Sequence, residues 1–200
     1  MRQKTRAVTL LELLIAIILI GIIVLAIASI EVFSRYHVTS SDRRARLQNE
    51  VSTTLEHMSK QLLGAIGNTG NWAVKVNNNC IRVRLDSNHN GFVDDNDTWI
   101  AYCLAGISTP DPVINFYPNA GTDVNPGGTI ETLAHKITVL QFSPGSPDGS
   151  LDATDGSLHD SVLKVEITAR WLPDPAHPAS QDNPEVTMNN KISMPSVSTR

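Results

Sequence analysis

The feature that most constrains the fold is an uncharged apolar segment close to the amino terminus. Residues 13–30 carry no ionisable side chain, and about 20 apolar residues in a helix cross the hydrocarbon core of a bilayer. One carboxylate, Glu12, stands immediately before this segment. A charge at this depth is costly and is usually retained for a function. The segment therefore predicts a membrane helix, and Glu12 requires an explanation.

Three interpretations account for residues 1–30. A basic start, an apolar stretch and the small residues Ala26 and Ala28 are typical of a cleaved secretory signal peptide. The same stretch would also serve as an uncleaved anchor. Neither interpretation explains why a short basic leader, MRQKTRA, is followed directly by VTLLELL with Glu12 inside it. The third interpretation starts from this order.

The order resembles the class III signal of type IV prepilins and type II secretion pseudopilins. The resemblance implies that a prepilin peptidase cuts between Ala7 and Val8, that the new amino terminus is methylated, and that the apolar helix stays on the mature protein. Glu12 then becomes the fifth residue, the family's glutamate position, and Gly21 falls where many pilins have glycine. Ala7 stands where the signal usually has glycine, and Ser29 where many major pilins have proline.

This resemblance gives Glu12 a role in assembly. In a filament whose helices pack side by side, its carboxylate meets the α-amino group of a neighbouring subunit. The two charges neutralise each other in apolar surroundings and set the axial register. The alternative is a polar residue tolerated close to the membrane surface, where such side chains reach water.

Residues 31–66 have the spacing of an amphipathic helix. Apolar side chains recur three or four positions apart, which places them on one helical face. They are Leu47, Val51, Leu55, Met58, Leu62 and Ile66. Gly67 and Gly70 are predicted to end this helix, and we expect its apolar face to pack against a sheet.

The pattern of residues 80–103 predicts a β-hairpin with an acidic turn. Pairing the two strand-like flanks so that Asp86 faces Asp97 places Cys80 opposite Cys103. Directly opposed cysteines meet the distance requirement of a disulfide, so the register predicts a Cys80–Cys103 bridge. The further pairs are Ile81 with Tyr102, Val83 with Ile100, and Arg84 with Trp99 in a cation–π contact.

The turn of this hairpin has the spacing of an EF-hand calcium loop. The matching residues are Asp86, Asn88, Asn90, Gly91, Asp94 and Asp97. The carbonyl of Phe92 would supply a further ligand, and Asp95 could replace Asp97, which stands where the loop usually has glutamate. We expect a structural calcium ion here. The alternative is a polar turn without an ion, because Asp, Asn and Gly are turn residues in any case.

The remaining chain predicts an antiparallel sheet, with strands at 113–117, 136–142, 161–171 and 185–193. One helix followed by such strands indicates an α+β fold, an order that also resembles the larger minor pilins and pseudopilins. The expected parts are a leader at 1–7, an apolar helix half at 8–30, an amphipathic half at 31–66 and a globular β-sheet domain at 67–200.

No catalytic motif accompanies this organisation. The six histidines are scattered, and the mildly acidic net charge of −4 argues against a nucleic-acid partner. The resemblance implies no enzyme but a structural subunit of a type IV pilus-like filament: a minor pilin that primes assembly or lies near the tip, a minor pseudopilin of a type II secretion system, or a major pilin. A different class of function is a monomeric membrane-anchored calcium-binding or adhesive domain.

The resemblance also implies partners and a location. The partners are other pilin or pseudopilin subunits, prepilin peptidase, an inner-membrane assembly platform, and membrane lipid before assembly. The subunit would lie in the bacterial inner membrane with its globular domain in the periplasm, and then in an extracellular or periplasmic filament.

Overall fold

The computed structural model describes residues 9–68, 70–77, 79–121 and 128–195. The chain divides into two compact units, residues 1–42 and 43–200. One helix, α1 (Leu10–Leu62), supplies the described helical part of the first unit and the opening of the second. In the first unit every helical side chain from residue 10 to residue 39 is exposed, so this part of α1 offers apolar surface all around.

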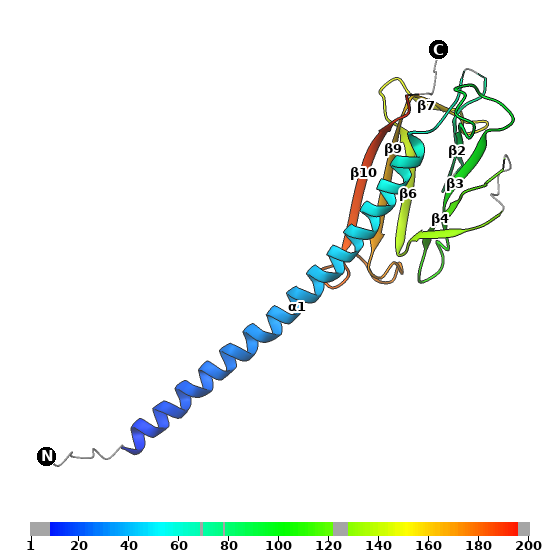
Figure 1. Ribbon diagram of the computed structural model, residues 1–200. Coiled ribbons are helices and arrows are strands. Elements are labelled where there is room, and N and C mark those ends of the chain that lie inside the picture. The colour runs from blue at the N-terminus through cyan, green and yellow to red at the C-terminus, as the bar shows by residue number, and fades with distance from the viewer. Residues whose placement is uncertain (1–8, 69, 78, 122–127, 196–200) are drawn as a thin grey trace. The chain divides into compact units, whose positions relative to one another are not determined.

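The second unit contains three antiparallel sheets (Figure 1). The five-stranded sheet follows chain order: β1 (Val74–Asn77), β2 (Cys80–Leu85), β3 (Thr98–Ala105), β4 (Val113–Tyr117) and β5 (Glu131–Ala134). The three-stranded sheet has the order β10 (Glu185–Ser193), β9 (Val162–Arg170) and β6 (Ile137–Pro144). A short pair joins β7 (Ser150–Leu151) to β8 (Leu158–His159). The predicted α+β class is confirmed.

One hydrophobic core joins the second half of α1 to both larger sheets. The helix contributes a buried face that includes Val51 and Met58, both fully buried. Tyr102 from β3 and Ile167 from β9 belong to the same cluster. The apolar helix positions, spaced three or four residues apart, thus pack against the inward-facing residues of the strands, as the sequence predicted.

The helix ends at Leu62, four residues before the predicted end at Ile66. Beyond Leu62 the backbone turns toward the edge of the sheet: Ala65 forms a bridge with Leu85, and the Ile66 N–H donates to the Arg84 carbonyl at 3.0 Å. Ala65 and Ile66 are still buried. The apolar spacing therefore continues past the end of the helix, because the same core is filled there by extended chain.

The hairpin register is confirmed. Cys80 pairs with Cys103, Ile81 with Tyr102 and Val83 with Ile100. A Cys80–Cys103 disulfide joins the two strands with 4.1 Å between the Cα atoms. The Arg84 guanidinium lies 4.8 Å from the centre of the Trp99 ring. The strands predicted at 113–117 and 185–193 have the observed bounds of β4 and β10, whereas β1, β5, β7 and β8 were not predicted.

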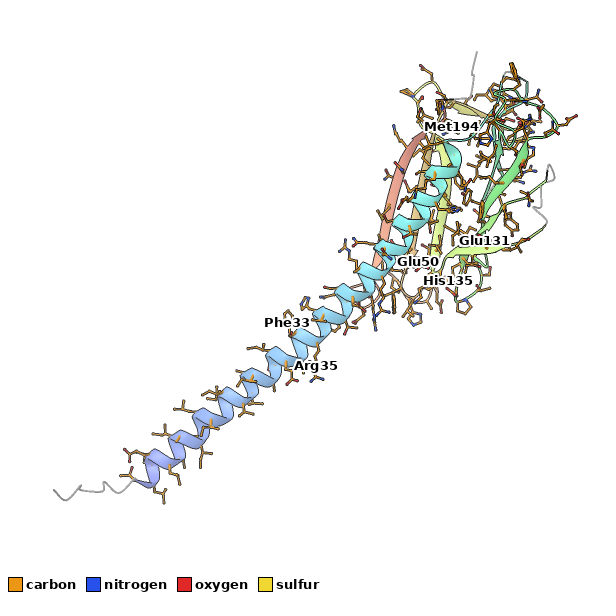
Figure 2. All side chains as sticks on the ribbon, in the orientation of Figure 1. Phe33, Arg35, Glu50, Glu131, His135 and Met194 are labelled. Atoms are coloured by element: carbon orange, nitrogen blue, oxygen red, sulfur yellow. A yellow bond between two sulfur atoms is a disulfide. The ribbon has the colours of Figure 1, made fainter. Side chains whose placement is uncertain are left out.

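A turn between β5 and β6 is fixed to the helix by polar contacts. The His135 backbone N–H donates to the Glu50 carboxylate at 2.6 Å, and Figure 2 shows these two residues beside each other. The His135 ring bonds Asp111 at 2.8 Å, and the Lys136 N–H donates to the same carboxylate at 3.2 Å. Lys136 has a φ of 61°, a conformation that side chains other than glycine seldom adopt. These bonds hold it there.

Candidate functional site

Thr9 and Glu12 close the first turn of α1. The Glu12 carboxylate accepts hydrogen bonds from the Thr9 backbone N–H at 2.8 Å and from the Thr9 hydroxyl at 3.0 Å. The Glu12 backbone N–H donates to the Thr9 hydroxyl oxygen at 3.3 Å. This reciprocal arrangement is a capping box, which satisfies N–H groups that an isolated helix end leaves open. Glu12 therefore has a local structural role beside the predicted assembly role.

The pattern T-x-x-E at Thr9–Glu12 could have revealed this cap from the sequence. The cap was not among the predictions, which explained Glu12 only by the depth of its charge in the apolar segment. The predicted processing residues, Ala7 and Val8, lie outside the described residues. The helix in the first unit thus begins with a capped carboxylate whose side chain is exposed.

Among the described residues, α1 is long and apolar enough to cross a membrane. An 18-residue window within it has a mean hydropathy of 3.3, and none of that window is buried by the protein itself. Apolar surface of this extent requires a covering of lipid or of other apolar helices. The exposed side chains include Leu13, Ile17 and Ile20.

The acidic loop of the β2–β3 hairpin is folded around its own side chains. The Asp86 carboxylate accepts the backbone N–H groups of Asn90 at 3.2 Å and Gly91 at 2.8 Å. The Asp94 carboxylate accepts the side-chain amides of Asn88 at 3.0 Å and Asn90 at 2.7 Å. Gly91 has a φ of 76°, which suits glycine and agrees with its predicted place at the sharp turn of the loop. The side chains thus converge as the spacing predicted.

The charge of Asp94 is stabilised within this loop. Hydrogen bonds from the Asn96 backbone N–H, and then from the Asn88 and Asn90 amides, hold the pKa of the Asp94 carboxyl below its usual value. Asp97 accepts the Asp94 N–H at 3.0 Å through one oxygen. Its other oxygen, Oδ1, is buried and has no hydrogen-bond partner among the described residues. An unpaired buried carboxylate oxygen is an available ligand for a cation.

The loop fits a calcium ion in part. Across the described ranges there is no group of three or more His, Cys, Asp or Glu side chains placed to hold a metal. The side-chain NH2 groups of Asn88 and Asn90 face Asp94. Calcium takes oxygen ligands, so both amides would have to rotate to present their oxygens. The oxygens of Asp86 and Asp94 already accept hydrogen bonds from the loop, so among these three carboxylates the unpaired Oδ1 of Asp97 is the oxygen left for an ion.

The comparison with protein families decides what the amino-terminal segment is. The model of the prokaryotic N-terminal methylation motif matches residues 2–28. The chain carries a type IV pilin-type class III signal. A search of curated proteins gave no match. The pilin-type signal supports a type IV pilin or pseudopilin subunit, and it implies processing by a prepilin peptidase and assembly with other pilin subunits. It also indicates a structural subunit and membrane anchoring.

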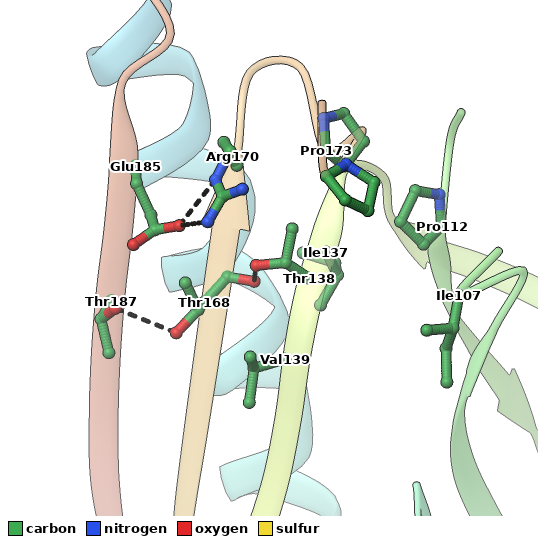
Figure 3. Close-up of a pocket in the computed structure, with 11 residues that line it drawn as sticks. Ile107, Pro112, Ile137, Thr138, Val139, Thr168, Arg170, Pro173, Glu185 and Thr187 are labelled. Atoms are coloured by element: carbon green, nitrogen blue, oxygen red, sulfur yellow. Dashed lines mark hydrogen bonds and ion pairs between the residues drawn. The ribbon is translucent and has the colours of Figure 1, made fainter. Parts of the chain in front are cut away.

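The second unit has a cleft of about 450 Å³ beside the three-stranded sheet (Figure 3). Its polar side chains bond one another: Arg170 pairs with Glu185, and the hydroxyls of Thr168 and Thr187 lie 2.9 Å apart. The facing wall is apolar and includes Ile107 and Pro173. This cleft therefore offers shape and apolar surface, with its charged pair already neutralised.

Proposed function

We propose that the protein is a minor pilin that primes filament assembly or lies near the filament tip. The observation that carries the proposal is the pilin-type signal joined to an exposed apolar helix whose first turn contains Glu12. A helix with no buried residue in its apolar window gains its stability only when lipid or neighbouring helices cover it. On assembly, neighbouring helices would replace lipid as the covering of this helix.

Two features favour a minor over a major subunit. The globular domain is large, with ten strands described after the helix. Ser29 occupies the position where many major pilins have proline, and its hydroxyl donates to the Leu25 carbonyl at 2.9 Å within an α1 that is continuous from Leu10 to Leu62. A minor pseudopilin of a type II secretion system is the second candidate, because it would share the signal, the helix and Glu12. A major pilin is the third.

Glu12 is assigned the assembly role in this proposal. Its carboxylate would pair with the α-amino group of Val8 in a neighbouring mature subunit. The capping box does not prevent this, because Thr9 bonds one carboxylate oxygen, Oε2, and leaves Oε1 for a second partner. Pairing neutralises two charges that would otherwise be costly in apolar surroundings.

The processing step is tested by the mass and amino-terminal sequence of the mature protein, purified from its native cell envelope. We expect a chain that starts at N-methylated Val8 and keeps its apolar helix. A start at Ser29 would show ordinary secretion and would exclude the filament function. An intact Met1 with normal membrane insertion would support the monomeric anchored domain instead.

We also propose that the β2–β3 loop binds a structural calcium ion through Asp86, Asn88, Asn90, Asp94, Asp97 and the Phe92 carbonyl. The proposal rests on the unpaired Asp97 oxygen and on the four carboxylates of one short loop. The ion would join the two ends of the hairpin turn and offset the repulsion among these charges. The disulfide already fixes the other end of the hairpin.

Calcium should raise the melting temperature of the full chain in detergent by about 5–10 °C, since a ligand at 100 times its Kd adds about 2.7 kcal/mol. Asp86→Ala and Asp97→Ala should abolish the rise, and Asp95→Ala should keep it. Asp174→Ala, in another loop, serves as the control. If calcium does not change the melting temperature of the wild-type chain, the proposal is wrong and the loop is a polar turn without an ion.

A further inference from the structure

A second cleft, of about 240 Å³, lies over β1, β2 and β3. It opens on the side of the five-stranded sheet that faces away from the core. Ile81 and Val83 of β2 are fully buried in the core, so the alternating residues Arg82 and Arg84 point to the opposite side. Lys75 is the cross-strand partner of Arg82. The register therefore gathers three cations from two strands on one face.

The residues that line this cleft are mainly basic and aromatic. They include Trp72, Lys75, Arg82, Arg84, Trp99 and Asp155. Within the described part of the chain the lining holds three cations and one carboxylate, Asp155. Arg82 is only 8% exposed, so its charge lies in a region where water screens it little. The cleft thus carries an excess of positive charge in a partly desolvated setting.

Arg84 provides the most specific indication of a ligand. Its guanidinium stacks over the Trp99 ring, 4.8 Å from the ring centre. Its Nε atom is buried and has no hydrogen-bond partner in the ranges that the structure describes. A buried N–H of a charged group is costly when it is left unpaired. An oxyanion in the cleft would accept the terminal N–H groups of the guanidinium and neutralise its charge, although it would not reach the buried Nε.

Asp155 pairs with one of these cations, Lys75. Its carboxylate accepts the Lys75 ammonium at 3.1 Å and the Ser157 hydroxyl at 2.7 Å. The Ser157 hydroxyl and backbone N–H, together with Lys75, lower the pKa of Asp155 to about 2. Asp155 is therefore ionised at neutral pH. It holds Lys75 at the cleft.

The Trp72 ring forms a fixed wall beside these cations. It stacks on His159 with 4.0 Å between the ring centres and 20° between the planes. A stacked indole loses little freedom when a ligand packs against it. An aromatic wall next to arginine donors is a suitable surface for a small ring that carries an anionic group.

We propose that this cleft binds a single oxyanion group, either phosphate or carboxylate, carried by a compact molecule such as a sugar. Arg84 and Arg82 would donate to the oxyanion, Lys75 would add charge, and Trp72 would contact the ring that bears it. Arginine suits this role because its planar fork matches the geometry of carboxylate and phosphate oxygens. The lining residues belong neither to the apolar residues 10–39 nor to the loop from Asp86 to Asp97, so the test does not depend on filament function.

Titration of the full chain in detergent, by calorimetry or by NMR, tests the proposal with inorganic phosphate, glucose 6-phosphate, glucuronate and neutral glucose. The three anions should bind and glucose should not. Binding should weaken as salt increases, because the attraction is between charges. Binding of glucose equal to that of glucose 6-phosphate, or no binding of any anion at tens of millimolar, would overturn the proposal.

Variants identify the cleft as the site. Arg84→Gln should weaken anion binding about tenfold or more, the loss expected for one charge-assisted hydrogen bond. Asp155→Asn should strengthen it, because the competing carboxylate is removed. Lys164→Gln, a matched cation on β9 that pairs with Glu166 at 3.1 Å, should leave it unchanged. Equal affinity of wild type and Arg84→Gln, or loss of affinity in Asp155→Asn with an unchanged melting temperature, would refute the assignment.

The two sources of the oxyanion are then distinguished by Trp72→Ala. Tighter binding of glucose 6-phosphate than of inorganic phosphate, lost in Trp72→Ala, would support a sugar-borne anion. Equal affinities for the two phosphates in both chains would retain the oxyanion site and assign it to the free ion.

Discussion

Replacing Glu12 with leucine should abolish incorporation into filaments while the protein still inserts in the membrane. The substitution removes the charge that would pair with a neighbouring amino terminus, and it leaves that amino group unpaired in apolar surroundings. It also makes the helix more apolar, which favours the lipid-inserted state. Immunoblots of sheared filaments and of isolated membranes measure the two outcomes separately. A monomeric anchored domain would show no defect in either fraction.

Glu12→Gln distinguishes assembly from helix capping. Glutamine at this position can keep the capping box with Thr9, because an amide oxygen also accepts the Thr9 N–H. It cannot form the charge pair. We therefore expect Glu12→Gln to fail in assembly almost as completely as Glu12→Leu. Normal assembly of Glu12→Gln would mean that the cap explains Glu12. Ser29→Ala, which loses only a bond to its own helix, is the control and should assemble normally.

The hairpin was predictable because its determinants are close in sequence. Alternating side chains fix which face of each strand is buried, and the two cysteines select one register among the possible ones. The structure has that register from Cys80 to Leu85. The strands β4, β6, β9 and β10 were recognised for the same reason, since each is a run of at least five residues with strand character.

The short strands escaped prediction because their pairing is decided elsewhere. β1 has four residues and is defined by its contact with β2, and β5 joins β4 through an irregular register at Ile114 and Asn115. The basic cleft has the same origin. It brings Asp155 to Lys75, 80 positions apart in the chain. No local pattern contains such a contact, so the cleft could only be found once the sheet was folded.

The acidic loop shows the difference between spacing and bonding. The spacing correctly brought Asp86, Asn90 and Asp94 together. It did not reveal that the two amides donate to Asp94, because the orientation of an amide depends on its neighbours. The capping box is the reverse case, because the short T-x-x-E motif contains both residues that form it.

Tyr102→Ala should have the largest effect on the stability of the globular unit, about 3–5 kcal/mol, the range for removing a large buried aromatic side chain. Tyr102 is fully buried, its ring lies 5.0 Å from that of Phe116, and its hydroxyl bonds His57 on α1 at 3.1 Å. It therefore joins β3 to the helix. Tyr117→Ala, on the half-buried outer side of the sheet, should cost much less. Chemical denaturation followed by tryptophan fluorescence measures both.

Tyr102→Phe separates the packing of this ring from its titration. Burial raises the pKa of the Tyr102 hydroxyl, so above about pH 10 the unfolded chain releases this proton and the folded chain keeps it. The free energy of unfolding should therefore fall as the pH rises beyond 10. Tyr102→Phe should lose about 1 kcal/mol at neutral pH, the net value of one hydrogen bond, and should show a flatter alkaline decline than the wild type. An unchanged decline in Tyr102→Phe would place the alkaline sensitivity in other residues and would show that the Tyr102 hydroxyl can ionise within the fold.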